Sequence, residues 1–460
     1  WCISRQLWWG HQIPVFYCKD CNHRWATSDK PSECPKCKSK NIFQDPDVLD
    51  TWFSSGLWPM TTLGWPNPER MKEKGFDDFF PGSCLVTGHD IIFFWVARMM
   101  MFALKLEKKI PFKDIYIHAL LRDKLGRKMS KSLGNGIDPI EVTKEYGADA
   151  LRFTLASGSG HNRDLNLDPA RFEGYRNFMN KIWNAFRFIS PYLENATGHL
   201  PEVSKLTHQE KWILAELNLV SDKVNSSIEQ YRFDESCSAI YSFTYDKFCS
   251  WFIELSKKTL QGEEQSAAIQ RSNVLHYSFK ELVKLLHPFC PFITEEIWGY
   301  LKSEQEDLLI VSQFPNSKKE FDFPVDCEQM NHFIDLITST RNLRSSVNIS
   351  PKEKVDLHVF CDDSSVGDYL KEQTNFICEM GQLKSLQIAP KNDSRPPKSI
   401  LNATETFEVF IPLEGVIDLD EQIQRLNKNL LKAKKELDKY TKKLNNPKFI
   451  DSAPDEIVFD

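Results

Sequence analysis

The sequence lacks three features that would place it in a special class of protein. It has no apolar run near the roughly 18 residues that a membrane-spanning helix needs, and its first dozen residues do not resemble a secretory signal. It also has no excess of basic residues, since its net charge is -6. These absences argue against a membrane protein, a secreted protein and a general nucleic-acid-binding protein. At 460 residues, the chain should form roughly two to four domains in a reducing, cytoplasmic setting.

Cysteine is scarce as well, because 12 residues in 460 are too few for a disulfide-stabilised scaffold. Four of them form two Cys-x-x-Cys pairs, Cys18 with Cys21 and Cys34 with Cys37. Four thiolates complete a tetrahedral zinc site and leave no open position for a reacting molecule. The spacing therefore predicts a structural zinc ion, with paired disulfides or free thiols as the alternatives.

Hydrophobic patterns divide the following part of the chain into α/β and helical regions. An apolar run at 84–88, an amphipathic stretch at 90–106 and a β-branched run at 114–121 predict strand, helix and strand. That order is typical of a parallel α/β sheet. Apolar residues at spacings of three and four then continue from about residue 170 to 343, which predicts an α-helical bundle.

The C-terminal part of the sequence changes character again. Strand-like patches between residues 346 and 413 predict a small α/β module. Beyond them, apolar residues in steps of four and three predict a coiled-coil arm with a basic outer surface, and its seam consists of Leu419, Ile423, Leu426, Leu430, Ala433, Leu437, Tyr440 and Leu444. We therefore divide the chain into five segments: 1–46, 47–170, 171–345, 346–415 and 416–460.

The stretch LRDKLGRKMSKSLGN, residues 121–135, carries five cations among glycines and serines. Lysine ammonium groups, serine hydroxyls and exposed backbone amides suit a phosphate group. Such a loop can stabilise negative charge that moves toward a leaving pyrophosphate. A lysine-rich loop can equally be solvated surface, so composition alone leaves both interpretations open.

The order of residues in this stretch is more specific than its composition. Residues 128–132 read KMSKS, the signature of class I aminoacyl-tRNA synthetases. Together with DVLDTWFSSGLWP (47–59), LVTGHDIIFFWVARMM (85–100), SKSLGNGIDPIEV (130–142) and YGADALRFTLAS (146–157), it resembles the valyl-tRNA synthetase family. The DTWFSSG segment discriminates within the class, because the isoleucyl enzymes read closer to DVWFDSG there. The resemblance covers essentially the whole chain.

The resemblance implies that the KMSKS residues handle ATP. Lys131, assisted by Lys128, would bind the nucleotide and stabilise the transition state of adenylate formation. Ser130 and Ser132 would shape the loop and contact the nucleotide.

The same resemblance implies roles for four residues outside the loop. Gly88 and Asp90 would lie beside the adenosine, where Asp90 accepts hydrogen bonds from ribose hydroxyls. Trp52 and Trp95 would wall the amino-acid pocket, with ordinary core packing as the alternative for each.

The resemblance also implies an architecture and a set of partners. Segment 47–170 would be the second half of a Rossmann-like catalytic domain, preceded by a zinc module, and segment 171–345 would bind the anticodon. The basic arm would touch the tRNA backbone. The expected ligands are ATP with Mg²⁺, L-valine, the tRNA for valine and a structural Zn²⁺, and the expected state is a cytoplasmic monomer without a membrane partner.

Two features of the family do not occur in these 460 residues. No His-x-Gly-His signature is present, the nearest match being Gly10-His11, and no editing domain is present. We therefore expect a C-terminal part of a synthetase that is inactive alone, with an arm helix that is mobile or borrows a partner. The alternatives are a non-catalytic tRNA-binding protein built from synthetase parts and a synthetase for isoleucine or leucine.

Overall fold

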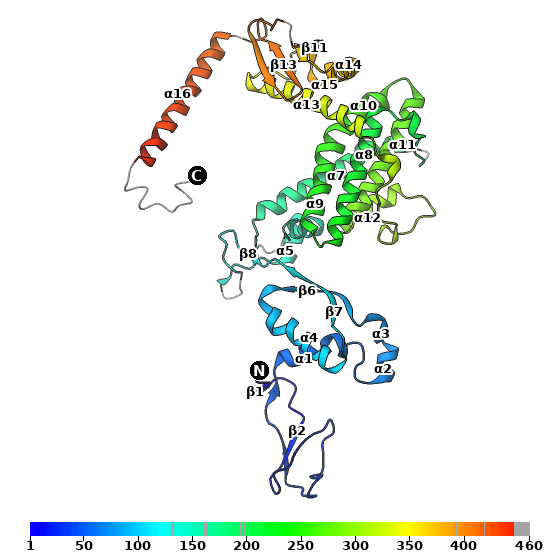
Figure 1. The fold of residues 1–460 in the computed structure, drawn as a ribbon, viewed down its shortest axis with the longest axis vertical. Helices are drawn as coiled ribbons and strands as arrows, with labels where there is room; N and C mark the ends of the chain where they lie inside the picture. Colours follow the sequence, from blue (N-terminus) through cyan, green and yellow to red (C-terminus); the bar gives the residue numbers. More distant parts are fainter. Residues whose placement is uncertain are drawn as a thin grey trace. The chain divides into compact units, whose positions relative to one another are not determined.

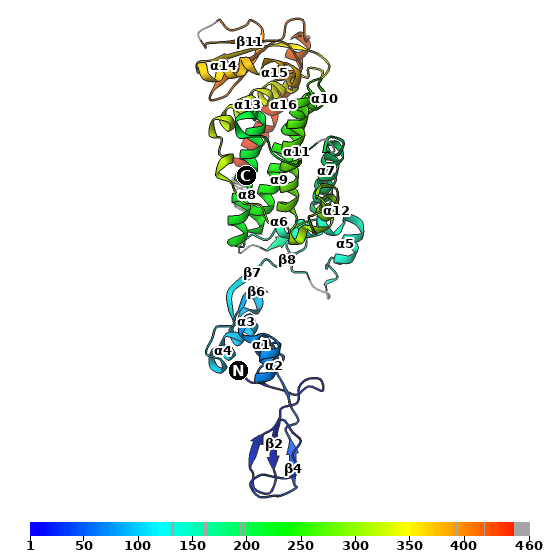
Figure 2. The same cartoon turned by 90° about the vertical axis from the view of Figure 1, so that its right-hand side faces the viewer.

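The structure is a computed structural model that describes residues 1–129, 133–160, 164–193, 196, 198–391, 394–417 and 419–445. The KMSKS residues Ser130, Lys131 and Ser132 lie outside the described residues. The chain divides into two compact units, which we describe separately (Figure 1, Figure 2). Unit 1 comprises Trp1–Phe188, Val220–Ser242 and Lys280–Asn316, and unit 2 comprises Ile189–Leu219, Phe243–Phe279 and Ser317–Asp460.

Unit 1 begins with a small antiparallel module. Its central strand β2 pairs with both β3 and β4, and β1 pairs with β5. Phe16 and Cys18 alternate along β2 toward the buried side, as the pleat of a strand requires. The strands are β1 (Ser4–Arg5), β2 (Val15–Cys18), β3 (Arg24–Ala26), β4 (Ile42–Gln44) and β5 (Val48–Leu49).

The predicted strand–helix–strand unit is confirmed in unit 1. β6 (Gly82–Gly88) and β7 (Phe112–His118) are parallel, and Gly88 lies opposite His118 at their carboxyl ends. α4 (Ala97–Leu106) connects the two strands and packs against α1 (Thr51–Thr61). The short helices α2 (Pro68–Glu73) and α3 (Phe76–Phe79) lie between α1 and β6 in the chain.

The helix predicted from residue 90 does not begin with α geometry. η1 (His89–Ile91) is a 3₁₀ turn and η2 (Ile92–Val96) is a π-helical turn, so regular α-helix starts only at Ala97. The η2 sequence IFFWV is β-branched or aromatic throughout, and such residues have lower α-helix propensity. Single π turns inside helices occur frequently at functional sites.

The strand predicted at 114–121 is interrupted before a second parallel pair. β8 (Leu121–Arg122) pairs with β9 (Leu165–Asn166) rather than continuing β7. The loop after β8 leads to α5 (Pro139–Tyr146) and α6 (Ala148–Ser157). Asp138 caps α5, because its carboxylate accepts the Ile140 amide at 2.8 Å.

The long helices predicted between about 170 and 343 are present and deeply packed. In unit 1 Trp298 is buried, and in unit 2 Trp212 and Phe248 are buried. The elements of this region are α7 (Pro169–Leu193), η4 (Val203–Lys205), α8 (His208–Glu229), α9 (Phe233–Ser242), η5 (Phe243–Phe252), α10 (Ile253–Gln261), α11 (Gln265–Leu286), α12 (Pro291–Leu301), η6 (Leu309–Val311), η7 (Lys319–Phe321) and α13 (Pro324–Ser346).

Unit 2 contains a mixed four-stranded sheet in the order β11-β10-β13-β12. β10 runs parallel to β11 and antiparallel to β13, and α13 packs on the sheet. The remaining elements are β10 (Val355–Cys361), α14 (Ser364–Glu372), α15 (Thr374–Gly381), β11 (Leu383–Ala389), β12 (Ser399–Ala403) and β13 (Phe407–Pro412).

The predicted arm is a helix, α16 (Leu419–Leu444) (Figure 1). Its seam residues Ile423, Leu430 and Leu437 are exposed, so the pairing of this helix in a coiled coil stays a prediction. In the described part of the chain, none of the helices combines the length and the apolar character needed to cross a membrane.

Candidate active site and metal centre

The carboxyl ends of β6 and β7 bring two predicted site residues together. Gly88 ends β6, and Asp90 follows in the 3₁₀ turn η1. A Cβ atom on Gly88 would lie 2.8 Å from Oδ1 of Asp90, so only glycine lets this carboxylate come so close to the strand. His118, which the sequence did not single out, lies opposite Gly88. Ligands of parallel sheets bind at such strand ends.

Lys128 reaches this strand end from the loop that follows β8. Its Nζ lies 3.6 Å from Oδ2 of Asp90, and both side chains are largely open to solvent. An exposed ion pair contributes little to stability. The pair therefore brings one KMSKS lysine close to the carboxylate that is predicted to bind the nucleotide. An anionic ligand bound there could contact the Lys128 ammonium group.

The turn that carries Lys128 is organised by Asp123, a residue that the sequence interpretation missed. Asp123 is 8% exposed, and its carboxylate accepts the amides of Leu125 at 3.0 Å and Arg127 at 2.9 Å. The Arg127 Nε and the Asn135 Nδ2 donate to the other oxygen at 2.8 and 3.0 Å. Hydrogen bonds from Asn135, and then from Arg127, hold the pKa of Asp123 well below its usual range.

A second ion pair fixes the base of the same turn. Arg122 donates through Nε to Asp164 and through NH1 to the Gly126 carbonyl, the latter at 3.2 Å. The hydrogen bond from Arg122 lowers the pKa of Asp164. The Asp-Lys-Leu-Gly order of 123–126 is a turn signal, and it could have predicted the turn, although not the partners from Asn135 and Asp164.

The structure brings both predicted pocket tryptophans to the contact between α1 and η2. The Trp52 ring lies 5.9 Å from the Phe94 ring in a stacked arrangement. The Trp95 indole donates to the Ser55 carbonyl at 3.2 Å, and Trp58 lies 6.1 Å from the Trp95 ring. Both predicted residues are half-buried, and their role as walls of an amino-acid pocket stays a prediction.

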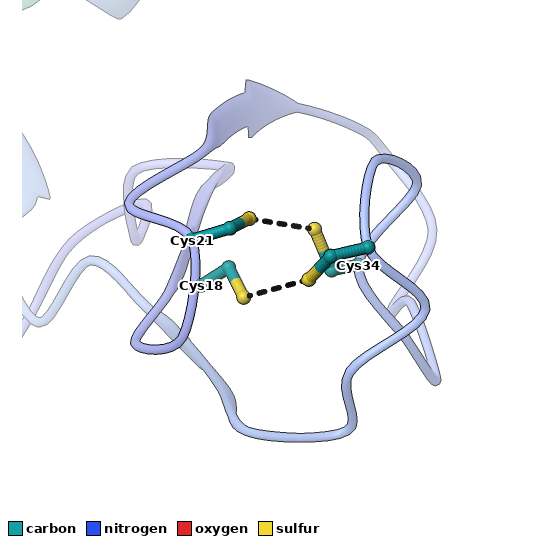
Figure 3. Close-up of side chains that lie close together, drawn as sticks. Cys18, Cys21 and Cys34 are labelled. Atoms are coloured by element: carbon teal, nitrogen blue, oxygen red, sulfur yellow. Dashed lines mark hydrogen bonds between the residues drawn. The ribbon is translucent and has the colours of Figure 1, made fainter.

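The four predicted thiols meet in the antiparallel module. All four Sγ atoms lie within 4.8 Å of one another, with Cys18 and Cys37 separated by 3.5 Å and Cys21 and Cys34 by 3.7 Å. Figure 3 shows Cys18 and Cys21 on one turn, facing Cys34 on the other.

Each Cys-x-x-Cys pair sits on a turn with the same backbone geometry. Asn22 donates its amide to the Cys18 carbonyl at 3.0 Å, and Lys38 donates to the Cys34 carbonyl at 2.9 Å. Both residues have a left-handed backbone, with φ of 53° and 61°. The two turns therefore present their thiols in equivalent ways.

This arrangement fits one tetrahedral ion. A zinc–sulfur distance of about 2.3 Å places the sulfur atoms of a tetrahedron about 3.8 Å apart, close to the two distances observed. Four thiols within 4.8 Å leave no position for a water or substrate, so the chemistry of the donor set is structural. Zinc would be held by Cys18, Cys21, Cys34 and Cys37.

Three family descriptions match successive parts of the chain. "tRNA synthetases class I (I, L, M and V)" matches residues 1–168, "Anticodon-binding domain of tRNA ligase" matches 210–359, and "Valyl tRNA synthetase tRNA binding arm" matches 418–459. Proteins named valine–tRNA ligase align over the full chain, with 42% identity for Carboxydothermus hydrogenoformans and 41% for Thermotoga maritima. The chain belongs to the valyl-tRNA synthetase family.

The chain spans about half the length of the curated relatives it matches, 51% in both of these cases.

Two solved structures share its fold. LeuRS of Agrobacterium radiobacter K84, in a ternary complex with tRNA and LeuAMS, has a TM-score of 0.57 at 23% identity and matches 70% of this chain and 42% of its own. The methionyl-tRNA synthetase of Mycobacterium tuberculosis, with methionyl-adenylate, has a TM-score of 0.50 at 21% identity over 64% of this chain and 53% of its own. The Rossmann-like and helical anticodon-binding regions are therefore those of a class I synthetase.

Proposed function

We propose that this chain is part of a valine–tRNA ligase. The complete enzyme joins valine to ATP as valyl-adenylate, releases pyrophosphate and transfers the valyl group to the tRNA for valine. The observation that carries this proposal is the approach of Lys128 to Asp90 at the carboxyl end of β6, in a chain that aligns in full with valine–tRNA ligases.

Under this proposal, each residue of the candidate site has a task in adenylate formation. Asp90, beside Gly88, accepts hydrogen bonds from the ribose hydroxyls of ATP. Lys128, and Lys131 in the same loop, offer mobile ammonium groups to the phosphates as charge moves to the leaving pyrophosphate. Ser130 and Ser132 add hydroxyl donors. ATP would arrive with Mg²⁺, which would neutralise part of the phosphate charge.

The remaining assignments rest on position and on the family. Trp52 and Trp95 form apolar walls for the valine side chain. The four thiols hold a structural Zn²⁺, supported by their spacing in the module. The helices of 171–345 bind the anticodon region and α16 binds the tRNA backbone through its lysines, supported by the matching family descriptions. A cytoplasmic monomer is part of the same proposal.

Valine-dependent exchange of pyrophosphate into ATP tests the proposal. The protein is expressed from its full reading frame, and valine, isoleucine and leucine are compared. Lys128→Ala is expected to lower kcat by about 10²- to 10³-fold, the effect of removing one donor to developing charge. Lys144→Ala, an exposed lysine on α5, is the matched control and should leave exchange unchanged.

Each other result selects an alternative. Exchange driven by isoleucine or leucine would identify a sister synthetase. Salt-sensitive tRNA binding without exchange for any of the three amino acids would favour the non-catalytic tRNA-binding protein. Equal loss in Lys128→Ala and Lys144→Ala would contradict the assigned site.

A further inference from the structure

The turn between β8 and Lys128 is a hairpin closed at Asp123. The Asp123 amide donates to the Arg127 carbonyl at 3.0 Å, and the Gly126 amide donates to the Asp123 carbonyl at 2.9 Å. Arg122 and Lys128 then face each other as an antiparallel bridge. Lys128 is therefore the first residue after the hairpin that Asp123 closes.

Donors from residues 125–135 occupy the acceptor sites of the Asp123 carboxylate. Two backbone amides bind one oxygen, and the other oxygen accepts the Arg127 guanidinium and the Asn135 side chain. A carboxylate offers about four lone-pair sites, so these donors account for them. Such charge-assisted bonds are the stronger class of hydrogen bond, and one buried side chain fixes the course of the whole turn.

Asn135 extends this arrangement to the lysine. Its Nδ2 lies 3.0 Å from Oδ2 of Asp123 and also donates to the Lys128 carbonyl at 3.3 Å. The Asp123 carboxylate and the Lys128 backbone are therefore joined through a single amide group. The Lys128 side chain leaves this fixed point and reaches Asp90 at 3.6 Å.

We propose that Asp123 is a positioning residue for the reaction, acting through Asn135 and Arg127 to fix the backbone from which Lys128 meets the nucleotide. The inference rests on the proposed function. Lysine has a long, flexible stem, so its ammonium is placed only as well as its Cα is fixed. A misplacement of about 1 Å far from the chemistry can cost about 10²-fold in rate. Asp123 itself touches no reacting atom.

Pyrophosphate exchange with the full-reading-frame protein tests this inference. Asp123→Asn keeps the shape of the side chain but removes its charge. It also replaces one acceptor oxygen by an amide nitrogen, which cannot accept the hydrogen bonds that Arg127 and Asn135 donate. We expect kcat to fall about 10- to 100-fold with the KM for valine unchanged. Glu141→Gln removes an exposed carboxylate on α5 and is the matched control without effect.

A double-mutant cycle separates positioning from general stability. If Asp123 acts through Lys128, Asp123→Asn combined with Lys128→Ala loses no more than Lys128→Ala alone. Fully additive losses would overturn the inference. The swap Asp123→Asn with Asn135→Asp restores one donor–acceptor pair and should recover part of the lost kcat, and no recovery counts against the link through Asn135.

Tryptic cleavage gives a readout that does not depend on activity. Release of the hairpin should raise the rate of cleavage after Arg127 at least about tenfold in Asp123→Asn relative to Glu141→Gln, because cleavage tracks local opening. An unchanged rate would overturn the inference. Should Asp123→Asn not fold, Asn135→Ala, which breaks the bridge and leaves the Arg127 contacts, takes its place in both measurements.

The two proposals fail in different ways. If the wild-type protein shows no valine-dependent exchange, the proposed function falls, and the positioning role falls with it. If the wild-type protein exchanges and Asp123→Asn exchanges at the same rate, only the positioning role is overturned.

Discussion

Two turn-rich segments of unit 1 have little apolar core, and different chemistry holds each of them. In the antiparallel module, four thiols from two equivalent turns converge within 4.8 Å. In the hairpin after β8, one carboxylate collects donors from residues that lie within twelve positions of it. The thiol cluster gathers four sulfurs that can bind one cation, whereas the Asp123 turn supplies a donor for each acceptor site of its carboxylate.

The two segments therefore differ in what they need from outside the chain. Ionised thiols this close repel one another, so a cation has to balance them. The Asp123 carboxylate already lies beside a guanidinium and an amide, so the turn needs no ligand to keep its shape. The thiol cluster should therefore depend on metal, and the Asp123 turn should not.

The largest expected effect comes from removing the proposed metal. Chelation, or Cys34→Ser, should unfold residues 15–44 while the Asp123 turn keeps its amide protection, because apparent binding energies of about 10–16 kcal/mol couple zinc to folding in small zinc modules. Zinc content and hydrogen exchange of the two segments measure this. Cys2→Ser, at an exposed cysteine outside the cluster, is the control. A module that keeps its protection after complete metal loss would show that residues 15–44 fold without metal.

The next effect comes from reversing the donor in the Asp123 turn. Asn135→Asp places a second carboxylate about 3 Å from the first, where Nδ2 now donates at 3.0 Å. We expect the Leu125 and Arg127 amides to exchange roughly tenfold faster, because two hydrogen bonds are lost and like charges meet. The thiol cluster should keep its proposed zinc in this variant. Simultaneous metal loss would mean that the two segments are not independent.

Sequence patterns predicted the thiol cluster but not the donors that hold the Asp123 turn. The two Cys-x-x-Cys pairs are recognisable in the sequence, because metal ligands recur at a fixed short spacing. The donors of Asp123 include Asn135 from beyond the hairpin, and no local pattern predicts which side chain returns to Asp123.

The same contrast holds for the fold and for the site. The strand–helix–strand unit and the long helices follow from periodicity, but the π turn at Ile92–Val96 does not. The β-branched and aromatic residues of this run lower its α-helix propensity, but that does not specify which other helix type forms. Sequence patterns did not predict the approach of Lys128 to Asp90, because the two residues are 38 positions apart and meet through β8 and the hairpin. The resemblance to the family implied only that each of them serves the nucleotide.

For pH, we expect no change in the protection of the Asp123 turn above pH 5. The pKa of Asp123 is lowered in the folded protein, chiefly by the Asn135 hydrogen bond. Its contribution is therefore fully present above the ordinary aspartate pKa of about 3.9 and is lost only as pH falls below that value. Amide protection at Leu125 and Arg127, corrected for intrinsic exchange, should stay constant from pH 8 to pH 5. A decline within that range would mean that the carboxylate is not held by these donors.

The last predictions compare the backbones of the two segments directly. Gly126 has φ of 75° and open space around its missing Cβ, so Gly126→Ala should cost about 1–2 kcal/mol through backbone strain alone. Lys38 in the thiol module has φ of 61° and already bears that strain, so Lys38→Gly should stabilise by up to about 1 kcal/mol after the entropy cost of glycine. Asn22→Gly should change little, because asparagine tolerates this conformation.

Local hydrogen exchange measures these changes, because its rate should change about fivefold per kcal/mol. Exchange should be slower around Lys38→Gly and faster around Gly126→Ala. Faster exchange around Lys38→Gly would mean that its side chain, and not its backbone, contributes to the turn.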